Sequence, residues 1–164
     1  MIESLPQTVG ELFRARQLKL ATAESCTGGL VGDMLTNVPG SSDYFLGGVV
    51  AYAYEAKTAL LGLTPEFLLA HGAVSAETAR AMARGARERL GADVALAITG
   101  ILGPGGGTPT KPVGLVYIAL LAADADRCQE FVWHAGRIEN KHSSAHAALE
   151  MLQKYLEGVD KLAS

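Results

Sequence analysis

The segment LKLATAESCTGGLVGDMLTNV, residues 18–38, predicts a strand that leads directly into a helix. Its first eight residues form a short apolar run with a polar end, which is typical of a buried strand. In its second half the leucines and the methionine share one helical stripe, and the sequence PGSS then ends the helix. A buried strand followed by a helix is the basic unit of α/β folds. Between the two, residues 24–27 (ESCT) either cap the helix or carry a nucleophile.

Helical and strand patterns alternate along the rest of the chain. Apolar residues three and four positions apart predict helices, and short apolar runs bounded by turn residues predict strands. The predicted helices cover residues 6–17, 54–62, 64–72, about 76–90 and about 140–158, and the predicted strands cover 44–53, 93–99, 113–123 and 127–135. Helices interleaved with buried strands predict an α/β fold, a three-layer α/β/α sandwich. The last three strands follow one another without a helix, so we expect one mixed, mostly parallel sheet.

Two further features concern the organisation of the chain. The paired glycines Gly47 and Gly48 inside a predicted strand indicate a bulge or a close neighbour. No linker, repeat or low-complexity segment interrupts the pattern, so we expect a single domain over residues 1–164. The apolar content and the glycine-paired strand would suit a homodimer.

The composition excludes several classes of partner. With 14 Lys+Arg against 17 Asp+Glu, the net charge of −3 provides no basic field for nucleic acid. No apolar run reaches the roughly 18 residues that a membrane span needs, and the first ten residues lack the pattern of a signal peptide. We therefore expect a cytoplasmic protein without nucleic-acid or membrane partners.

The cysteines and histidines do not predict a metal site. Cys26 and Cys128 lie in different elements and form no CxxC pair, so neither a zinc site nor a disulfide framework is expected. His142 and His146 are four residues apart, but no third ligand accompanies them.

Ser25 lies at the carboxyl end of the first predicted strand. In α/β sheets this edge is where ligands bind, and the main-chain N–H groups of a following helix can hold an oxyanion there. The alternative is that Ser25 caps the helix. Its neighbours do not form the G-x-S-x-G pattern of α/β-hydrolases. Cys26 is a rival nucleophile, but a small apolar cysteine packed under the turn is the better interpretation.

Tyr52 and Lys57 form a candidate partner pair for this serine. A serine hydroxyl needs a neighbour that takes its proton, and a lysine can do so only as the neutral amine, which requires burial to lower its pKa. A tyrosine beside that lysine could relay the proton. The alternative is an ordinary aromatic strand end and a surface lysine.

Thr99 repeats the position of Ser25 at the end of another buried strand. The glycine-rich segment GPGGGTP that follows, residues 103–109, could surround a phosphate with main-chain N–H groups. It lacks the lysine of a P-loop, and a mobile loop remains the alternative.

Six segments taken together point to a family. TAESCTGG, VPGSS, FLGGVVAYAYEAK, HGAVS, AITGILGPGGGT and KPVGLVYIAL resemble, in this order, the C-terminal domain of the competence/damage-inducible protein CinA. The resemblance covers roughly residues 5–157. Stand-alone members of that family are nicotinamide-nucleotide amidohydrolases.

The resemblance implies that nicotinamide mononucleotide is hydrolysed to nicotinic acid mononucleotide and ammonia, without metal or cofactor. It identifies Ser25 with the catalytic serine, with Tyr52 and Lys57 as its proton acceptors and Thr99 orienting the carboxamide or the serine. The substrate-binding residues that it implies are Cys26, Thr27, Gly28, Gly105, Gly106, Arg137 and Lys141.

The chain departs from the family pattern near its last helix. Ala135-Gly136-Arg137 stands where Gly-Asp-Arg is usual, and Lys141 replaces a common second arginine, which keeps the charge but loses the planar fork. Tyr54 and Leu102 replace smaller residues. Of these departures, Tyr54 and Lys141 favour the alternative function, a nucleotide-binding module without catalysis.

Overall fold

The structure, a computed structural model, describes residues 4–158. Its elements follow the predicted order, with one added 3-10 helix, η1. The helices are α1 (Leu5–Arg16), α2 (Leu30–Thr36), η1 (Ser41–Asp43), α3 (Tyr54–Leu61), α4 (Pro65–His71), α5 (Ala76–Leu90) and α6 (Arg137–Glu157). The strands are β1 (Leu20–Glu24), β2 (Phe45–Val50), β3 (Val94–Gly100), β4 (Leu115–Ala122) and β5 (Ala125–Val132).

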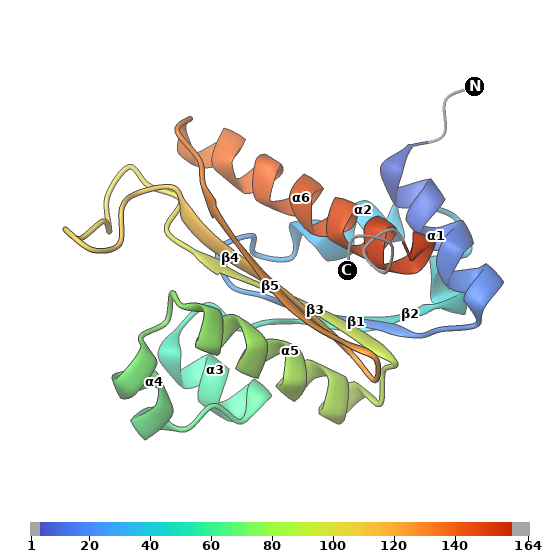
Figure 1. Ribbon diagram of the computed structural model, residues 1–164, viewed down its shortest axis with the longest axis horizontal. Coiled ribbons are helices and arrows are strands. Elements are labelled where there is room, and N and C mark those ends of the chain that lie inside the picture. The colour runs from blue at the N-terminus through green and yellow to red at the C-terminus, as the bar shows by residue number, and fades with distance from the viewer. Residues whose placement is uncertain (1–3, 159–164) are drawn as a thin grey trace.

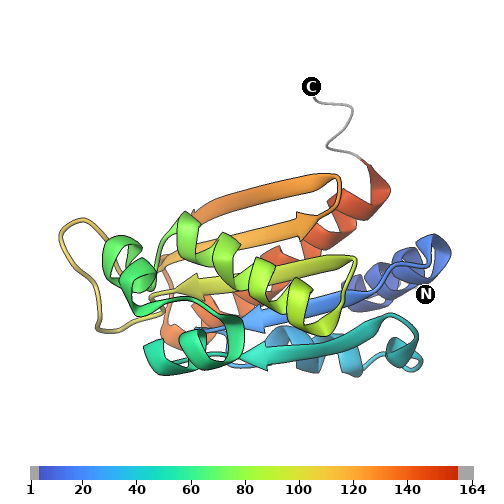
Figure 2. The same cartoon turned by 90° about the horizontal axis from the view of Figure 1, so that it is seen from below.

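The five strands form one mixed sheet in the order β2-β1-β3-β4-β5, as Figure 2 shows. β1 is parallel to both β2 and β3, whereas β4 is antiparallel to both β3 and β5. Four strands therefore run in one direction and only β4 opposes them, which confirms the predicted sheet. The carboxyl ends of β1, β2 and β3 meet at one edge.

The glycine pair in β2 accompanies both a bulge and a close neighbouring strand, the two features that the sequence indicated as alternatives. Leu20 pairs with Phe45 but Ala21 pairs with Gly47, so β2 has one extra residue at a bulge. A Cβ atom added at Gly48 would lie 2.4 Å from the Thr22 hydroxyl oxygen of β1. Only glycine allows the two strands to approach so closely at this point.

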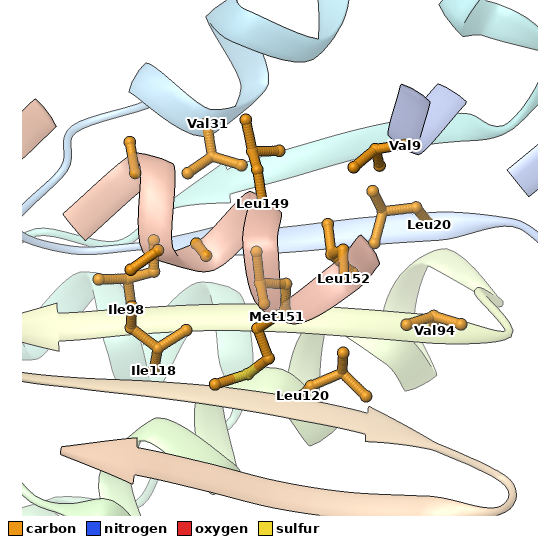
Figure 3. Close-up of a cluster of buried hydrophobic side chains, with 14 of the residues drawn as sticks. Val9, Leu20, Val31, Val94, Ile98, Ile118, Leu120, Leu149, Met151 and Leu152 are labelled. Atoms are coloured by element: carbon orange, nitrogen blue, oxygen red, sulfur yellow. The ribbon is translucent and has the colours of Figure 1, made fainter. Parts of the chain in front are cut away.

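Helices cover both faces of the sheet, with α1, α2 and α6 on one side and α3, α4 and α5 on the other (Figure 1). Because side chains alternate along a strand, the two faces have different residues. Figure 3 shows the first face, where branched side chains of the sheet meet those of α1, α2 and α6. The second face is lined mainly by alanines, such as Ala95 and Ala97, on which α5 packs. The small alanine side chains let α5 lie close to the sheet.

Within the described residues, no helix combines the length and the apolar character that crossing a membrane requires. The connection between β3 and β4 extends past the sheet edge at the end where α6 begins (Figure 1). This end of the molecule also holds the residues that follow β1 and β2. In α/β sheets, ligands bind at this end.

Candidate active site

Ser25 is the first residue after β1. Its main-chain N–H donates to the Ile98 carbonyl of β3 at 3.0 Å, so the residue is still held by the sheet. A turn over residues 25–28 follows, and Gly29 occupies the N-cap position of α2. The interpretation of Ser25 as the helix cap is therefore wrong. Its hydroxyl oxygen instead accepts a hydrogen bond from the Lys57 amine, Nζ to Oγ, at 3.0 Å.

Lys57 is a buried amine, with 1% of the residue exposed. Besides Ser25 it donates to the main-chain carbonyls of Ala51, at 2.9 Å, and Tyr52, at 3.0 Å. Burial lowers its pKa, because the charged amine loses the water that would stabilise it. The interpretation as a surface lysine is wrong.

The contacts of Lys57 suit a base. A neutral amine has two N–H bonds and one lone pair. When the Ala51 and Tyr52 carbonyls accept the two N–H bonds, the lone pair is left for the proton of the Ser25 hydroxyl. The Lys57 contacts thus provide the arrangement that a serine nucleophile needs.

Cys26 is buried beside the same contact. Burial is the main reason that its pKa is raised to about 12, and the N–H groups of Cys26 and Thr27 offset this only in part. The thiol therefore stays protonated at neutral pH and packs against the apolar core. A thiol in this state is a poor nucleophile, which leaves Ser25 as the stronger candidate.

Tyr52 does not lie as a proton relay would require. The residue is 60% exposed, and its hydroxyl accepts a hydrogen bond from the Arg137 guanidinium at 3.1 Å. Only its main-chain carbonyl reaches Lys57. The expected relay through the Tyr52 hydroxyl is not supported by this geometry, because the extended connection after β2 turns that side chain outward.

Thr99 is buried near the end of β3, and its hydroxyl donates to the Ala73 carbonyl at 2.6 Å. A hydroxyl has one proton and two lone pairs, so with this donation made Thr99 can only accept from a ligand. It is therefore suited to an amide NH₂ group. The contact also holds the segment between α4 and α5 against the site.

Arg137 is the first residue of α6, three residues before the predicted start of that helix. Its guanidinium bridges the Gly103 carbonyl, at 2.8 Å, and the Tyr52 hydroxyl. Asn140, one turn later, is buried and donates to the Leu102 carbonyl at 3.0 Å. The two side chains tie the start of the glycine-rich segment to the beginning of α6.

Asn140 was missed by sequence reasoning, although a signal exists. It begins the buried stripe of α6 that continues through Ser144 and Ala148, so a polar side chain stands where an apolar one is expected. Such a residue needs hydrogen-bond partners, and Asn140 finds them in Leu102 and in the N–H of Ala135.

A cavity of about 240 Å³ connects these residues. Eight of the expected site residues line it, together with residues 73–74 and 100–103. The eight are Ser25, Cys26, Tyr52, Lys57, Thr99, Gly105, Gly106 and Arg137.

Three expected site residues lie outside the lining of this cavity. The Thr27 hydroxyl is buried and donates to the Glu24 carboxylate, so it is not available to a ligand. Lys141 extends over the turn after Ser25, where a Cβ atom added at Gly28 would lie 3.5 Å from its Nζ. Gly28 and Lys141 thus lie next to each other, two residues beyond the cavity-lining Cys26 along the turn. Between residues 4 and 158, no group of three His, Cys, Asp or Glu side chains gathers as metal ligands would.

Comparison with known proteins identifies the family of the chain. The family model of the CinA C-terminal domain matches residues 2–156, nearly the whole chain. The chain belongs to the CinA C-terminal domain family.

Curated relatives of this family are about half identical to the chain. One relative, from Symbiobacterium thermophilum, is named a competence-damage inducible protein and is 52% identical over 95% of the chain. A CinA-like protein from Trichormus variabilis is 50% identical over 94%. The chain covers only 39% and 38% of these two proteins, so it spans less than two fifths of their length.

Solved structures of the CinA superfamily have the same fold. A protein of this superfamily from Klebsiella pneumoniae superposes with a TM-score of 0.90 at 31% identity, over 94% of this chain and 96% of that one. The competence/damage inducible protein from Agrobacterium tumefaciens gives a TM-score of 0.85 at 41% identity, covering 95% and 99%.

Proposed function

We propose that this domain of the CinA family is an amidohydrolase that converts nicotinamide mononucleotide to nicotinic acid mononucleotide and ammonia. The observation that carries the proposal is the buried contact between the Lys57 amine and the Ser25 hydroxyl. The specific substrate rests on the resemblance of the site residues to those of the family's stand-alone amidohydrolases.

The first half of the reaction forms an acyl-enzyme. Ser25 Oγ attacks the carboxamide carbon while its proton moves to the Lys57 amine, and a tetrahedral intermediate with a negatively charged oxygen results. The intermediate then collapses. The C–N bond breaks, the nitrogen takes the proton from Lys57, and ammonia leaves.

The second half of the reaction restores the serine. A water molecule transfers a proton to Lys57 and attacks the ester, the bond to Ser25 Oγ breaks, and the serine regains a proton. The product is a carboxylic acid, which releases its proton to water and leaves as a carboxylate. Lys57 thus acts first as a base and then as an acid in each half, which requires a pKa close to the working pH. Burial moves the Lys57 pKa in that direction.

A main-chain N–H group after Ser25 is suited to the charged oxygen of the intermediate. Among residues 4–158, the N–H group of Cys26, a residue that lines the cavity, meets no oxygen acceptor. Donors that are fixed before the reaction stabilise a developing oxyanion, and one such donor is typically worth about 3 kcal/mol.

The remaining parts of the substrate find partners around the cavity. Thr99 can accept a hydrogen bond from the carboxamide NH₂ group. Arg137 lines the cavity and presents the planar guanidinium that pairs well with a phosphate, and Lys141 adds a second positive charge next to Gly28.

Ser25→Ala is expected to lower ammonia release from nicotinamide mononucleotide at least about a thousandfold, because the nucleophile is lost. Circular dichroism should show an unchanged fold, since the hydroxyl contributes no main-chain contact. The assay compares the wild type and the variant, each with and without a chelator. Equal turnover by both proteins would contradict the role of Ser25.

The alternative, a nucleotide-binding module without catalysis, is favoured by one observation. Arg137 and Lys141, both near the start of α6, would attract a phosphate whether or not Ser25 reacts. A thermal-shift measurement separates the two functions, because a binding module is stabilised by the mononucleotide without consuming it.

A further inference from the structure

Glu24 is a buried carboxylate that the reaction above does not use. It is the last residue of β1, directly before Ser25, and 2% of it is exposed. Its Oε1 accepts hydrogen bonds from the Thr27 hydroxyl at 2.7 Å and from the Val31 N–H at 2.9 Å. Its Oε2 accepts one from the Gly32 N–H at 3.1 Å.

Glu24 acts only as an acceptor in these contacts. All three partners donate a hydrogen bond to its carboxyl oxygens, as they would to a carboxylate. No ion pair of the described residues involves Glu24, so neutral donors alone compensate the burial of its charge. A buried charge is a costly way to cap a helix, since an exposed Ser or Asp at the N-cap would satisfy the same N–H groups.

The position of Glu24 explains why a buried carboxyl group is useful here. Its bonds reach across the whole turn, from the strand end before Ser25 to the first turn of α2. The sheet holds one end of the turn through Ser25 N–H and Ile98 O, and a bond from Gly28 N–H to Ser25 O closes it. Glu24 fastens the other end through Thr27.

We propose that Glu24 is a positioning residue, which holds the turn after Ser25 so that the Cys26 N–H group faces the oxyanion of the reaction. The inference rests on the proposed function, because it assigns this N–H group to the tetrahedral intermediate. It identifies a residue that acts on the transition state through the main chain, without touching the substrate.

Glu24→Gln tests the proposal with little change of volume. The glutamine NH₂ group would face an N–H or O–H donor in place of an acceptor oxygen, so the turn must rearrange. We expect kcat to fall at least about tenfold while KM changes less than about threefold, since only the transition state carries the charge.

A boronic acid supplies a readout that a merely structural role would not change. In pyridine-3-boronic acid the trigonal boron bonds to Ser25 Oγ, the serine proton passes to Lys57, and a tetrahedral boronate anion forms, in which a hydroxyl oxygen takes the place of the oxyanion. Its inhibition constant should rise in Glu24→Gln by about the same factor as kcat falls. Thr64→Ala is the matched control, because it removes the N-cap of α4, outside the cavity lining, and should leave both quantities within about twofold.

The outcomes distinguish a failure of the inference about Glu24 from a failure of the proposed function. If Glu24→Gln melts at a lower temperature but keeps the kcat and the boronate affinity of the wild type, Glu24 is only a helix cap and the inference is wrong. If the wild type neither releases ammonia nor binds the boronate through Ser25, the proposed function fails and the inference fails with it.

If Glu24→Gln does not fold, Thr27→Val is the second variant, because it removes only the hydroxyl donor. A kcat lowered with KM unchanged then supports the inference, and an unchanged kcat overturns it.

Discussion

Lys57 meets two opposing demands in one side chain. Burial removes the water around its amine, which disfavours the charged form and lowers the pKa, as a base near neutral pH requires. The same burial costs folding free energy whenever the amine is protonated. The contacts with the Ala51 and Tyr52 carbonyls keep the amine in place despite this cost.

Comparing the wild type with Lys57→Met should reveal this cost through pH. In the folded protein the Lys57 pKa is lowered, whereas in the unfolded chain it has its ordinary value of 10.5. Between the two values the unfolded chain binds more protons, so the free energy of unfolding of the wild type rises with pH relative to the variant. The slope cannot exceed about 1.4 kcal/mol per pH unit.

Urea denaturation of both proteins at several pH values from 7 to 10 measures this difference, and other titrating groups cancel because the proteins share them. A difference that stays constant over the range would mean that the Lys57 pKa is not shifted.

The types of the site residues were predictable from the sequence, but not the directions of their side chains. Ser25 and Thr99 follow apolar runs, and such positions meet at one edge of a parallel sheet. The outward direction of the Tyr52 hydroxyl could not be predicted, because it depends on Arg137, 85 residues later in the chain. The role of Glu24 was hidden for a similar reason, since its partners Val31 and Gly32 belong to the next element.

At the scale of the elements, the position of α3 decides whether Lys57 reaches Ser25. Helix α3 is only eight residues long and packs against α5. The contact is closest at Gly85, where an added Cβ atom would lie 2.2 Å from the Leu61 carbonyl oxygen at the end of α3. A main-chain atom cannot move aside as a side chain can, so this glycine sets the distance between the two helices.

Gly85→Ala should therefore destabilise the protein by about 1 to 3 kcal/mol. The sign is informative, because Gly→Ala inside a helix otherwise stabilises a protein by about 0.5 to 1 kcal/mol. The measurement is the urea midpoint at constant slope, with Arg84→Ala, an exposed neighbour, as the control. A Gly85→Ala variant as stable as the wild type would show that α3 moves easily, and its amidohydrolase activity would then test whether Lys57 has moved with it.

Element order was predictable because each element carries its own periodicity, but boundaries and neighbours were less so. Helix α6 begins at Arg137, whereas the apolar stripe suggested a start near Asn140. The first turn faces the glycine-rich segment through Arg137, and its one apolar residue, Ile138, is exposed and does not belong to the buried stripe. Strand order could not be predicted, since β1 pairs with both β2 and β3 through contacts between distant residues.

At the scale of the whole molecule, the sheet belongs to two cores at once. Leu149 of α6 is fully buried on one face, and Met82 of α5 is fully buried on the other. Each strand contributes alternate side chains to both cores, so neither core can be lost while the sheet remains. The active site depends on this arrangement, because α3 with Lys57 and α6 with Arg137 cover opposite faces of the sheet (Figure 1).

Leu149→Ala and Met82→Ala should each lower the free energy of unfolding by about 2 to 5 kcal/mol, and each should do so in one transition. Trp133, the single tryptophan, packs against the core that contains Leu149, so its fluorescence reports on that face alone, whereas far-ultraviolet circular dichroism reports on the whole chain. The informative variant is Met82→Ala, whose change is on the other face. Its fluorescence and dichroism midpoints should coincide and shift together from those of the wild type. The opposite outcome is a dichroism transition that splits in two while the fluorescence midpoint stays in place. It would show that the two faces unfold separately. The two halves of the site would then be held together less firmly than one shared sheet implies.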